Sequence, residues 1–90
     1  MRVVLTRRAQ SNLTAIRAYI RKDNPAAATR VAAASATTCH RLQYLPDRGR
    51  PGAVAGAREI VAFWPYVIVY QIEGDIVYIL RIRHGSQAHE

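Results

Sequence analysis

The sequence predicts one α+β domain spanning residues 1–90, with the element order β-α-α-β-β-β. In the first half, apolar residues recur at steps of three and four, which is the spacing of one helical face. In the second half, β-branched and aromatic residues dominate three runs that are separated by turn residues, as is typical of strands. We therefore expect an antiparallel sheet that is packed on one face by an αα-hairpin.

The N-terminal segment predicts a short strand followed by an amphipathic helix. The strand is expected at Arg2–Thr6, where the sequence is RVVLT. Thr6 suits the N-cap position, because its hydroxyl can accept an orphan backbone N–H. The helix should then run from Arg7 to about Lys22. Its apolar face consists of Ala9, Leu13, Ile16 and Ile20.

A second helix should begin directly after a short break. Asn24 is a favourable N-cap, and Pro25 suits the first helical position because its missing N–H costs nothing there. This helix is expected to end near Tyr44, and the short turn predicts that the two helices are antiparallel neighbours. The stripe expected to face the core is Ala28, Val31, Ser35, Thr38 or Cys39, Leu42 and Leu45.

The C-terminal half predicts a loop and three strands. The segment 45–56, LPDRGRPGAVAG, is rich in Pro and Gly and should be irregular. The strands are expected in AREIVAF, PYVIVYQI and DIVYILRIR. Gly74-Asp75 marks a hairpin turn between the last two, and Phe63–Pro65 should turn the chain between the first two.

The last strand is apolar on both sides at its start. Because successive side chains alternate, Ile76, Tyr78, Leu80 and Ile82 should share one face. The opposite face should then carry Val77, Ile79, Arg81 and Arg83. That second face begins apolar, ends basic and has no helix left to cover it, which indicates a partner protein. The alternative is that the segment 45–56 folds over it.

The charge of the chain favours an anionic or acidic partner. Thirteen Lys and Arg face six acidic residues, so the net charge is +7, and such a field attracts anions and acidic surfaces. A merely solvated basic surface, nucleic acid and an acidic protein are the alternatives. No apolar run reaches the length of a membrane span, and no signal peptide is recognisable. Cys39 is the only cysteine, so we expect a cytoplasmic protein without a disulfide.

Four segments carry a family resemblance. In order they are NPAAATR, LPDRGRPG, GAREI and YVIVYQIEGDIVYILRIRHGSQ. Together they resemble the ParE branch of the RelE/ParE toxin superfamily. The resemblance implies the toxin of a type II toxin–antitoxin pair, held inactive by a ParD-like antitoxin. ParE-like toxins poison DNA gyrase by trapping its cleaved-DNA complex, whereas RelE-like toxins cut mRNA on the ribosome.

If the chain cuts RNA, the ends of its predicted strands would have to supply the catalytic side chains. That reaction needs a base, an acid and cations that stabilise the phosphorane. The catalytic candidates are Arg58, Arg81, Arg83 and His84, and we expect the strand ends that carry them to lie close together. Glu59 is a candidate base, but alternation places it on the face opposite Arg58.

The composition of this region favours gyrase binding over catalysis. RelE-like ribonucleases carry lysines or acidic residues before the strand that corresponds to AREIVAF, and a tyrosine or a histidine–tyrosine pair near the C-terminus. In this chain the only lysine is Lys22, in the first helix, and no tyrosine follows His84. We therefore expect a toxin that is not an enzyme and needs no cofactor or metal. An mRNA endoribonuclease, or a degenerate toxin that only binds its antitoxin, are the alternatives.

The residues expected to bind partners lie on two surfaces. One is the basic end of the sheet, where acidic residues of the antitoxin would pair, and the other is the first helix, where an amphipathic antitoxin helix would pack. DNA would be contacted only through the antitoxin or gyrase. The expected binding residues are Arg58, Arg81, Arg83, His84, Gln87, Leu13, Ile16 and Ile20.

Overall fold

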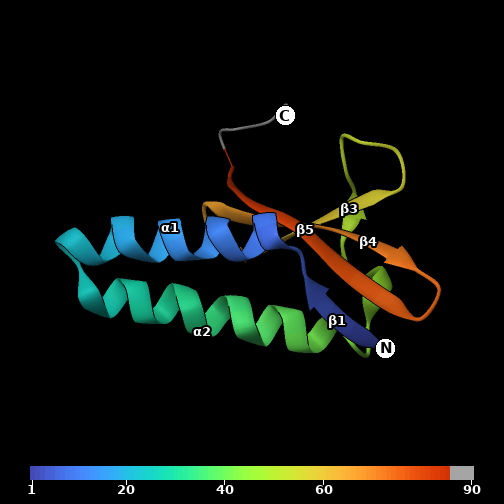
Figure 1. Cartoon of the computed structure of the whole chain (residues 1–90), viewed down its shortest axis with the longest axis horizontal. Helices are drawn as coiled ribbons and strands as arrows, with labels where there is room; N and C mark the ends of the chain where they lie inside the picture. The colour runs from blue at the N-terminus through green and yellow to red at the C-terminus, as the bar shows by residue number, and fades with distance from the viewer. Residues whose placement is uncertain (86–90) are drawn as a thin grey trace.

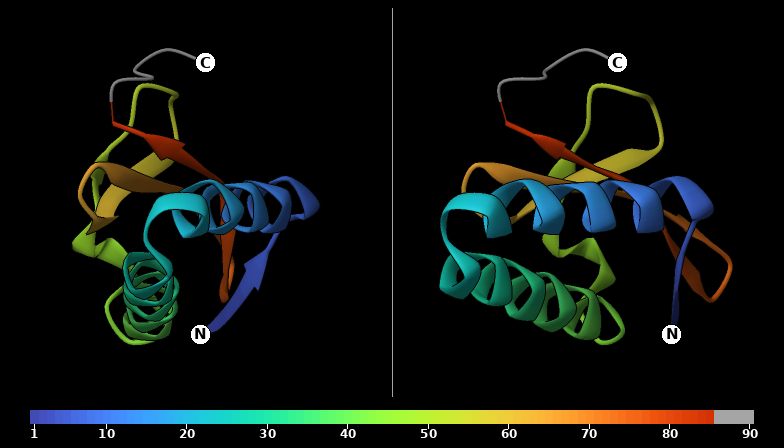
Figure 2. Two further views of the ribbon diagram at one scale, coloured as in Figure 1. Left: turned by 90° about the vertical axis from the view of Figure 1, so that its left-hand side faces the viewer. Right: turned by 60° about the vertical axis from the view of Figure 1, so that its left-hand side comes forward.

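The computed structural model describes residues 1–85. Its five-stranded sheet has the order β1-β5-β4-β3-β2, in which β1 is parallel to β5 and the other pairs are antiparallel. Both helices lie side by side on one face of this sheet, which confirms the predicted class (Figure 1, Figure 2). The elements are β1 (Arg2–Leu5), α1 (Arg7–Asp23), α2 (Pro25–Leu42), the 3-10 turn η1 (Pro46–Arg48), β2 (Arg50–Pro51), β3 (Ala57–Phe63), β4 (Tyr66–Glu73) and β5 (Ile76–His84).

The predicted caps define the helical hairpin. Thr6 Oγ1 accepts the backbone N–H of Ala9 at 3.2 Å and so begins α1. Asn24 serves both helices, because its own N–H donates to the Ile20 carbonyl at 2.9 Å and its Oδ1 accepts the Ala27 N–H at 3.0 Å. One residue therefore ends α1 and begins α2, which makes the turn between the helices as short as the sequence predicted.

The core lies between the helices and the sheet. The sheet contributes its largest buried side chains, and α1 and α2 contribute Ala9 and Leu42. Leu13 and Ile16 of α1 are half-buried against this core, and Ile20 is also half-buried, so these three expected partner-binding residues expose only part of their surface. The sheet residues of the core are Ile68, Tyr70, Val77, Ile79 and Ile82.

A β-bulge in β5 overturns the expected division of its faces. Tyr70 pairs with Ile79 and Val69 pairs with Arg81, so Leu80 has no opposite residue on β4. A bulge adds one residue and reverses the alternation beyond it. As a result Ile82 joins Val77 and Ile79 beneath the helices, and the two arginines follow Ile76 and Tyr78 onto the face without helices. We call that second face the open face.

The segment expected to be a loop contains two short elements that the sequence analysis missed. Tyr70 Oη donates to the Pro46 carbonyl at 2.7 Å and accepts the Gly49 N–H at 2.8 Å, which ties η1 to the sheet. A Cβ at Gly49 would lie 2.5 Å from Tyr70 Oη, so only glycine fits there. After β2, Gly52 passes close to Glu59, so the chain itself covers part of the open face.

Candidate functional site

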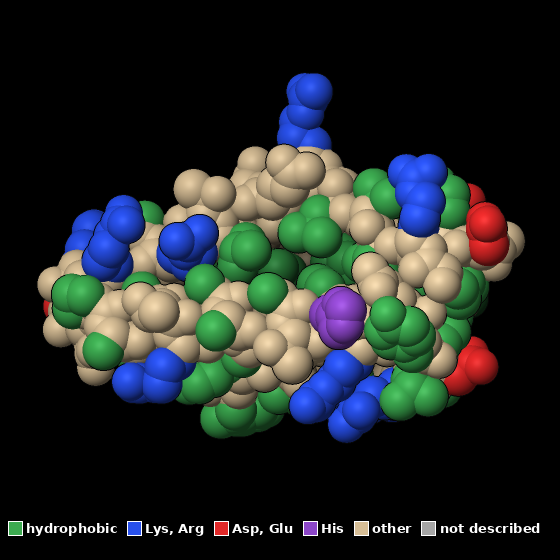
Figure 3. Space-filling view, turned by 90° about the horizontal axis from the view of Figure 1, so that it is seen from below, with side chains coloured by type: hydrophobic (Ala, Val, Ile, Leu, Met, Phe, Trp, Pro, Cys, Tyr) green, Lys and Arg blue, Asp and Glu red, His purple; other side chains and the backbone are tan. Residues whose placement is uncertain are grey.

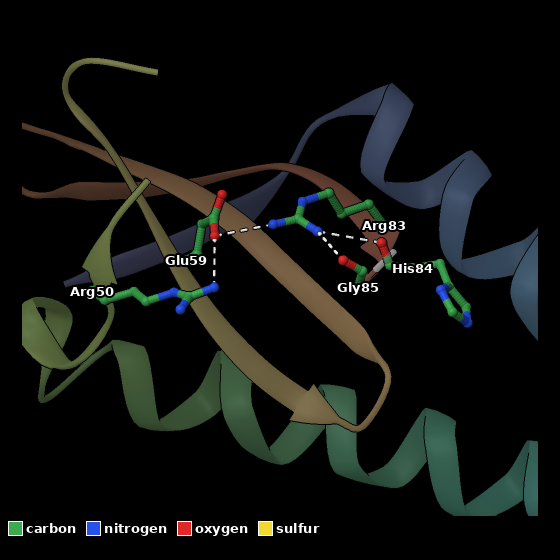
Figure 4. Close-up of polar contacts among 5 residues, drawn as sticks. All are labelled: Arg50, Glu59, Arg83, His84 and Gly85. Carbon is green, nitrogen blue, oxygen red and sulfur yellow. Dashed lines mark hydrogen bonds and ion pairs between the residues drawn. The ribbon is translucent and has the colours of Figure 1, made fainter. Parts of the chain in front are cut away.

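A buried ion pair lies at the centre of the open face. Arg83 Nη2 of β5 donates to Glu59 Oε1 of β3 at 3.0 Å, and the two residues are 6% and 7% exposed (Figure 4). Arg50 of β2 reaches the same oxygen at 3.3 Å from a side chain that is mostly exposed. The expectation that Arg83 is displayed to a partner is therefore wrong, because the bulge and the strand register place a carboxylate against it.

The remaining nitrogens of Arg83 are only partly satisfied. Its Nη1 donates to the carbonyls of His84 at 3.2 Å and Gly85 at 3.4 Å (Figure 4). Its Nε is buried and has no acceptor among residues 1–85. A buried donor without an acceptor is costly and uncommon. This atom is a feature that a further partner group could satisfy.

The ionisation of Glu59 follows from its surroundings. Burial raises the pKa of its carboxyl. Four other effects lower this pKa, and together they outweigh burial: the hydrogen bond from Arg83, the charge of Arg83, the backbone N–H of Ala53 and the charge of Arg50. The net effect is a pKa below the usual glutamate value. Glu59 is therefore ionised at neutral pH and neutralises the guanidinium of Arg83 locally.

Arg58 lies away from the C-terminal end of β5, because its opposite residue on β4 is Tyr70 and that of His84 is Tyr66. Its Nη1 donates to the carbonyls of Gly49 at 2.9 Å and Asp47 at 3.3 Å, on the helix-covered side of the sheet. The expectation that the strand ends meet is wrong, since β3 and β5 are separated by β4 and run in the same direction. Across β4, the start of β3 is consequently level with the middle of β5 rather than with its end.

His84 ends β5 on the helix-covered side. Its ring packs edge-on against Tyr66, with centroids 5.6 Å apart. Together with Ile16 and Tyr19 of α1 it lines a hollow of about 500 Å³. Because neighbouring residues point to opposite faces, His84 and Arg83 do not share a site. Arg81 is half-exposed on the open face opposite Val69, and Gln87 lies outside the described residues.

A second hollow opens beside the ion pair. It measures about 460 Å³, and the buried Val67 is among its lining residues. At its rim lies Trp64, which is 72% exposed. Its ring lies beside Gly85, in the turn that follows β3. The hollow is lined by Arg50, Glu59, Ile60, Val61, Trp64, Val67, Arg83 and Gly85.

Positive charge predominates over negative charge on one face of the molecule. Figure 3 shows Lys and Arg side chains spread over the face seen there, with Asp and Glu only at its margins. Within residues 1–85, no three His, Cys, Asp or Glu side chains group as metal ligands. In the same part of the chain, neither helix has the length and apolar character needed to cross a membrane.

Comparisons with known proteins match nearly the whole chain. Residues 3–89 match a family model described as "ParE toxin of type II toxin-antitoxin system, parDE". The chain is 46% identical over 85 residues to "Toxin RelE2" of Caulobacter vibrioides, covering 94% of this chain and 96% of that protein. It is 45% identical over 87 residues to "Putative toxin Y4kP" of Sinorhizobium fredii, covering 96% and 90%.

A solved structure has the same fold. It is described as "Chromosomal ParDE TA system from P. aeruginosa" and superimposes with a TM-score of 0.84 at 27% identity. The similarity covers 93% of this chain and 95% of that one. The fold of nearly the whole chain therefore agrees with that of this solved structure.

Proposed function

The chain belongs to the ParE toxin family of type II toxin–antitoxin systems, and from this premise we propose that it arrests growth by binding DNA gyrase and trapping the cleaved-DNA complex. A ParD-like antitoxin neutralises it. The toxin acts by binding, without catalysis of its own. The observation that carries this proposal is the dispersal of the candidate catalytic side chains over two faces of the sheet.

RNA cleavage needs its acid, base and cations around one phosphate. Here Arg58 and His84 lie on the helix-covered side. Along β4, their opposite residues Tyr70 and Tyr66 are four positions apart, which corresponds to about 13 Å. The Arg83 guanidinium lies on the other face and is neutralised by Glu59. This arrangement supports a binding surface better than a ribonuclease centre.

One observation favours ribosome-dependent RNA cleavage as the second candidate. Arg81 lies on the open face opposite Val69, where it would supply positive charge to a phosphate. One relative also carries the name RelE2. For this candidate, His84 would have to act from the far side of the ribbon, which the alternation of β5 disfavours.

The experiment that separates the candidates induces the toxin in cells carrying an SOS reporter and maps mRNA ends in parallel. We expect SOS induction and intact mRNA. With purified components, we expect inhibited supercoiling and accumulation of cleaved DNA in complex with gyrase. Cuts within translated codons that disappear in His84→Ala or Arg81→Ala, without SOS induction, would establish the ribonuclease instead.

A matched control distinguishes loss of function from loss of charge. Arg17→Ala removes one exposed cation from α1. This variant should remain toxic if the loss of activity in Arg81→Ala does not come merely from the loss of one positive charge. A wild-type chain that causes neither SOS induction nor mRNA cleavage, and no growth defect, would identify a degenerate toxin. Each outcome therefore assigns one of the three functions.

A further inference from the structure

The positive charge of the chain is concentrated on its helical hairpin. Residues 7–42, which contain α1 and α2, carry seven Lys and Arg and one acidic residue, a net charge of +6. The rest of the chain carries six Lys and Arg and five acidic residues, a net charge of +1. In Figure 3 the acidic side chains accordingly gather towards the right-hand end, while Lys and Arg flank the helices on the left.

The acidic residues of the sheet half lie close to its arginines. Glu59 contacts Arg83 and Arg50, and Asp47 lies 3.6 Å from Arg58. On the hairpin, the single carboxylate of Asp23 cannot balance seven cations. The unbalanced field of this protein therefore originates from the helices, and an anionic partner would be drawn to them.

Helix stability does not account for this distribution of charge. Neither helix has an acidic residue in its first turn, and α1 begins with Arg7 and Arg8. The helix macrodipole favours acidic residues at this end and disfavours cations. The arginines at the start of α1 therefore cost the helix some stability, which indicates that they serve binding.

Three exposed cations meet at the free end of the hairpin. Arg21 and Lys22 lie in the last turn of α1, and Arg30 follows five residues after the start of α2. Because the helices are antiparallel, all three lie near the turn at the left of Figure 1, remote from the sheet. Arg7 lies about 21 Å away along α1. Duplex DNA carries one charge per about 1.7 Å of its axis, so a surface of this length spans many phosphates.

Neutral donors lie between these cations on α1. A shallow hollow of about 420 Å³ begins at Arg7 and includes the exposed hydroxyls of Ser11 and Thr14. Phosphate oxygens accept hydrogen bonds from Arg, Ser and Thr side chains in most protein–DNA contacts. The hollow is lined by Arg7, Gln10, Ser11, Thr14, Ala15 and Ala18.

The side chains around the cations select duplex DNA among the anionic partners. Protein interfaces depend on large apolar anchors, but Tyr19 is the one large hydrophobic residue that α1 and α2 expose. Single strands need several aromatic side chains for stacking, which the same surface does not offer. An α-helix also fits the major groove of B-DNA, about 12 Å wide, whereas the major groove of duplex RNA is deep and narrow.

We propose that the outer surface of the helical hairpin binds the phosphate backbone of duplex DNA without sequence preference, through Arg7, Arg21, Lys22 and Arg30. This goes beyond the expectation that DNA is contacted only through the antitoxin or gyrase. That the duplex is the one held by gyrase rests on the proposed function, whereas the DNA contact itself does not.

The test measures the affinity of the purified toxin for fluorescent DNA duplexes of unrelated sequence by anisotropy. The duplexes should bind equally well. A plot of log affinity against log salt concentration should have a slope of about −3 to −4, which corresponds to three or four neutralised phosphates. Arg21→Gln with Lys22→Gln should weaken binding by about tenfold or more near 0.1 M salt and reduce the slope by about 2.

Two further variants separate the position of the charge from its amount. Arg2→Gln with Arg48→Gln makes the same change in net charge at exposed positions outside the hairpin, so it should weaken binding much less. Arg21→Lys with Arg30→Lys keeps both charges and should bind nearly as wild type does. Circular dichroism of each unbound variant checks that the hairpin is folded.

The proposal is overturned if the Arg21 and Lys22 variant binds DNA no more weakly than the Arg2 and Arg48 variant. It is also overturned if duplex RNA of the same length, poly-glutamate, or vesicles containing phosphatidylserine bind wild type at least as tightly as DNA does.

The gyrase assay keeps this inference separate from the proposed function. A wild-type chain that binds the duplex as described but traps no cleaved DNA with gyrase would reject the proposed function and leave the DNA contact standing. A chain that traps cleaved DNA with gyrase, yet binds no duplex by itself near 0.05 M salt, would reject the DNA contact alone, since low salt strengthens such binding.

Discussion

At the scale of single residues, Glu59 determines how much positive charge the open face presents. It is shared by a buried arginine and an exposed one, at 3.0 Å from Arg83 and 3.3 Å from Arg50. Desolvating two charges is expensive, and the cost is offset only when both partners remain. The pair therefore matters less for net stability than for the penalty that follows when one member is removed.

Glu59→Gln should lower the free energy of unfolding by about 3–5 kcal/mol, because it leaves the Arg83 charge buried without its anion. Urea denaturation measures the loss. Arg50→Gln is the matched control and should cost less than about 1 kcal/mol, since its side chain is mostly exposed. The double variant Glu59→Gln with Arg83→Met should recover much of the lost stability. Equal losses in Glu59→Gln and Arg50→Gln would contradict a special role of the buried pair.

Stability should fall in acid because of the same carboxyl. The pKa of Glu59 is lower in the folded chain than in the unfolded chain. Its contribution is therefore present above the unfolded value, about 4.3, and disappears as pH falls through the lower folded value. The free energy of unfolding measured from neutral pH downward should decline less steeply in Glu59→Gln than in wild type, and identical slopes would exclude Glu59 as a cause.

The burial of Arg83 could not be foreseen from residue types. The sequence shows an arginine at a strand end, which usually means a solvated charge. Its partner Glu59 lies 24 positions away, and the two meet only through the β3–β4–β5 register and the bulge at Leu80. Alternation alone separated Arg58 from Glu59 correctly, because β3 is regular at that point.

At the scale of elements, local signals predicted most boundaries. Thr6, Asn24 and Pro25 fixed the helix starts, and Gly74 at φ +61° occupies the hairpin turn that its sequence indicated. β2 and η1 were missed because two or three residues carry no periodicity. Their positions depend on the hydrogen bonds of Tyr70 to the Pro46–Gly49 segment, which link residues far apart in the chain.

Asn24→Ala should destabilise the helical hairpin by about 1 kcal/mol, because the side-chain cap of α2 is lost. Asn24→Asp keeps an acceptor at the same place and should stay close to wild type. Thermal unfolding followed by far-UV circular dichroism measures both. If alanine and aspartate gave the same midpoint as asparagine, the bond from the Ala27 N–H to Asn24 Oδ1 would contribute nothing.

At the scale of the whole molecule, net charge should govern how fast partners are found. A chain with charge +7 would attract an acidic partner from beyond contact distance. Raising the salt from about 0.05 to about 0.5 M shortens the screening length several-fold. The association rate with the antitoxin should therefore fall by about tenfold or more while dissociation changes little. Stopped-flow mixing at several salt concentrations measures the association rate. A rate that does not change with salt would exclude electrostatic steering.

Chain length, element order and the ordered set of motifs were enough to predict the fold and the superfamily. The cellular target could not be predicted from the same features, because one fold supports both gyrase binding and RNA cleavage. The side chains that would distinguish these activities are a few arginines and one histidine, and their faces depend on the bulge in β5 rather than on their spacing in the sequence.

The parallel pairing of β1 with β5 has a consequence for biosynthesis. Residues 2–5 leave the ribosome well before residues 76–79, which are their strand neighbour within the described residues. Until β5 emerges, the nascent chain carries a finished helical hairpin beside an unclosed sheet. The sheet is therefore incomplete until β5 has been translated, and a partner already present in the cell can meet the chain before this strand is in place.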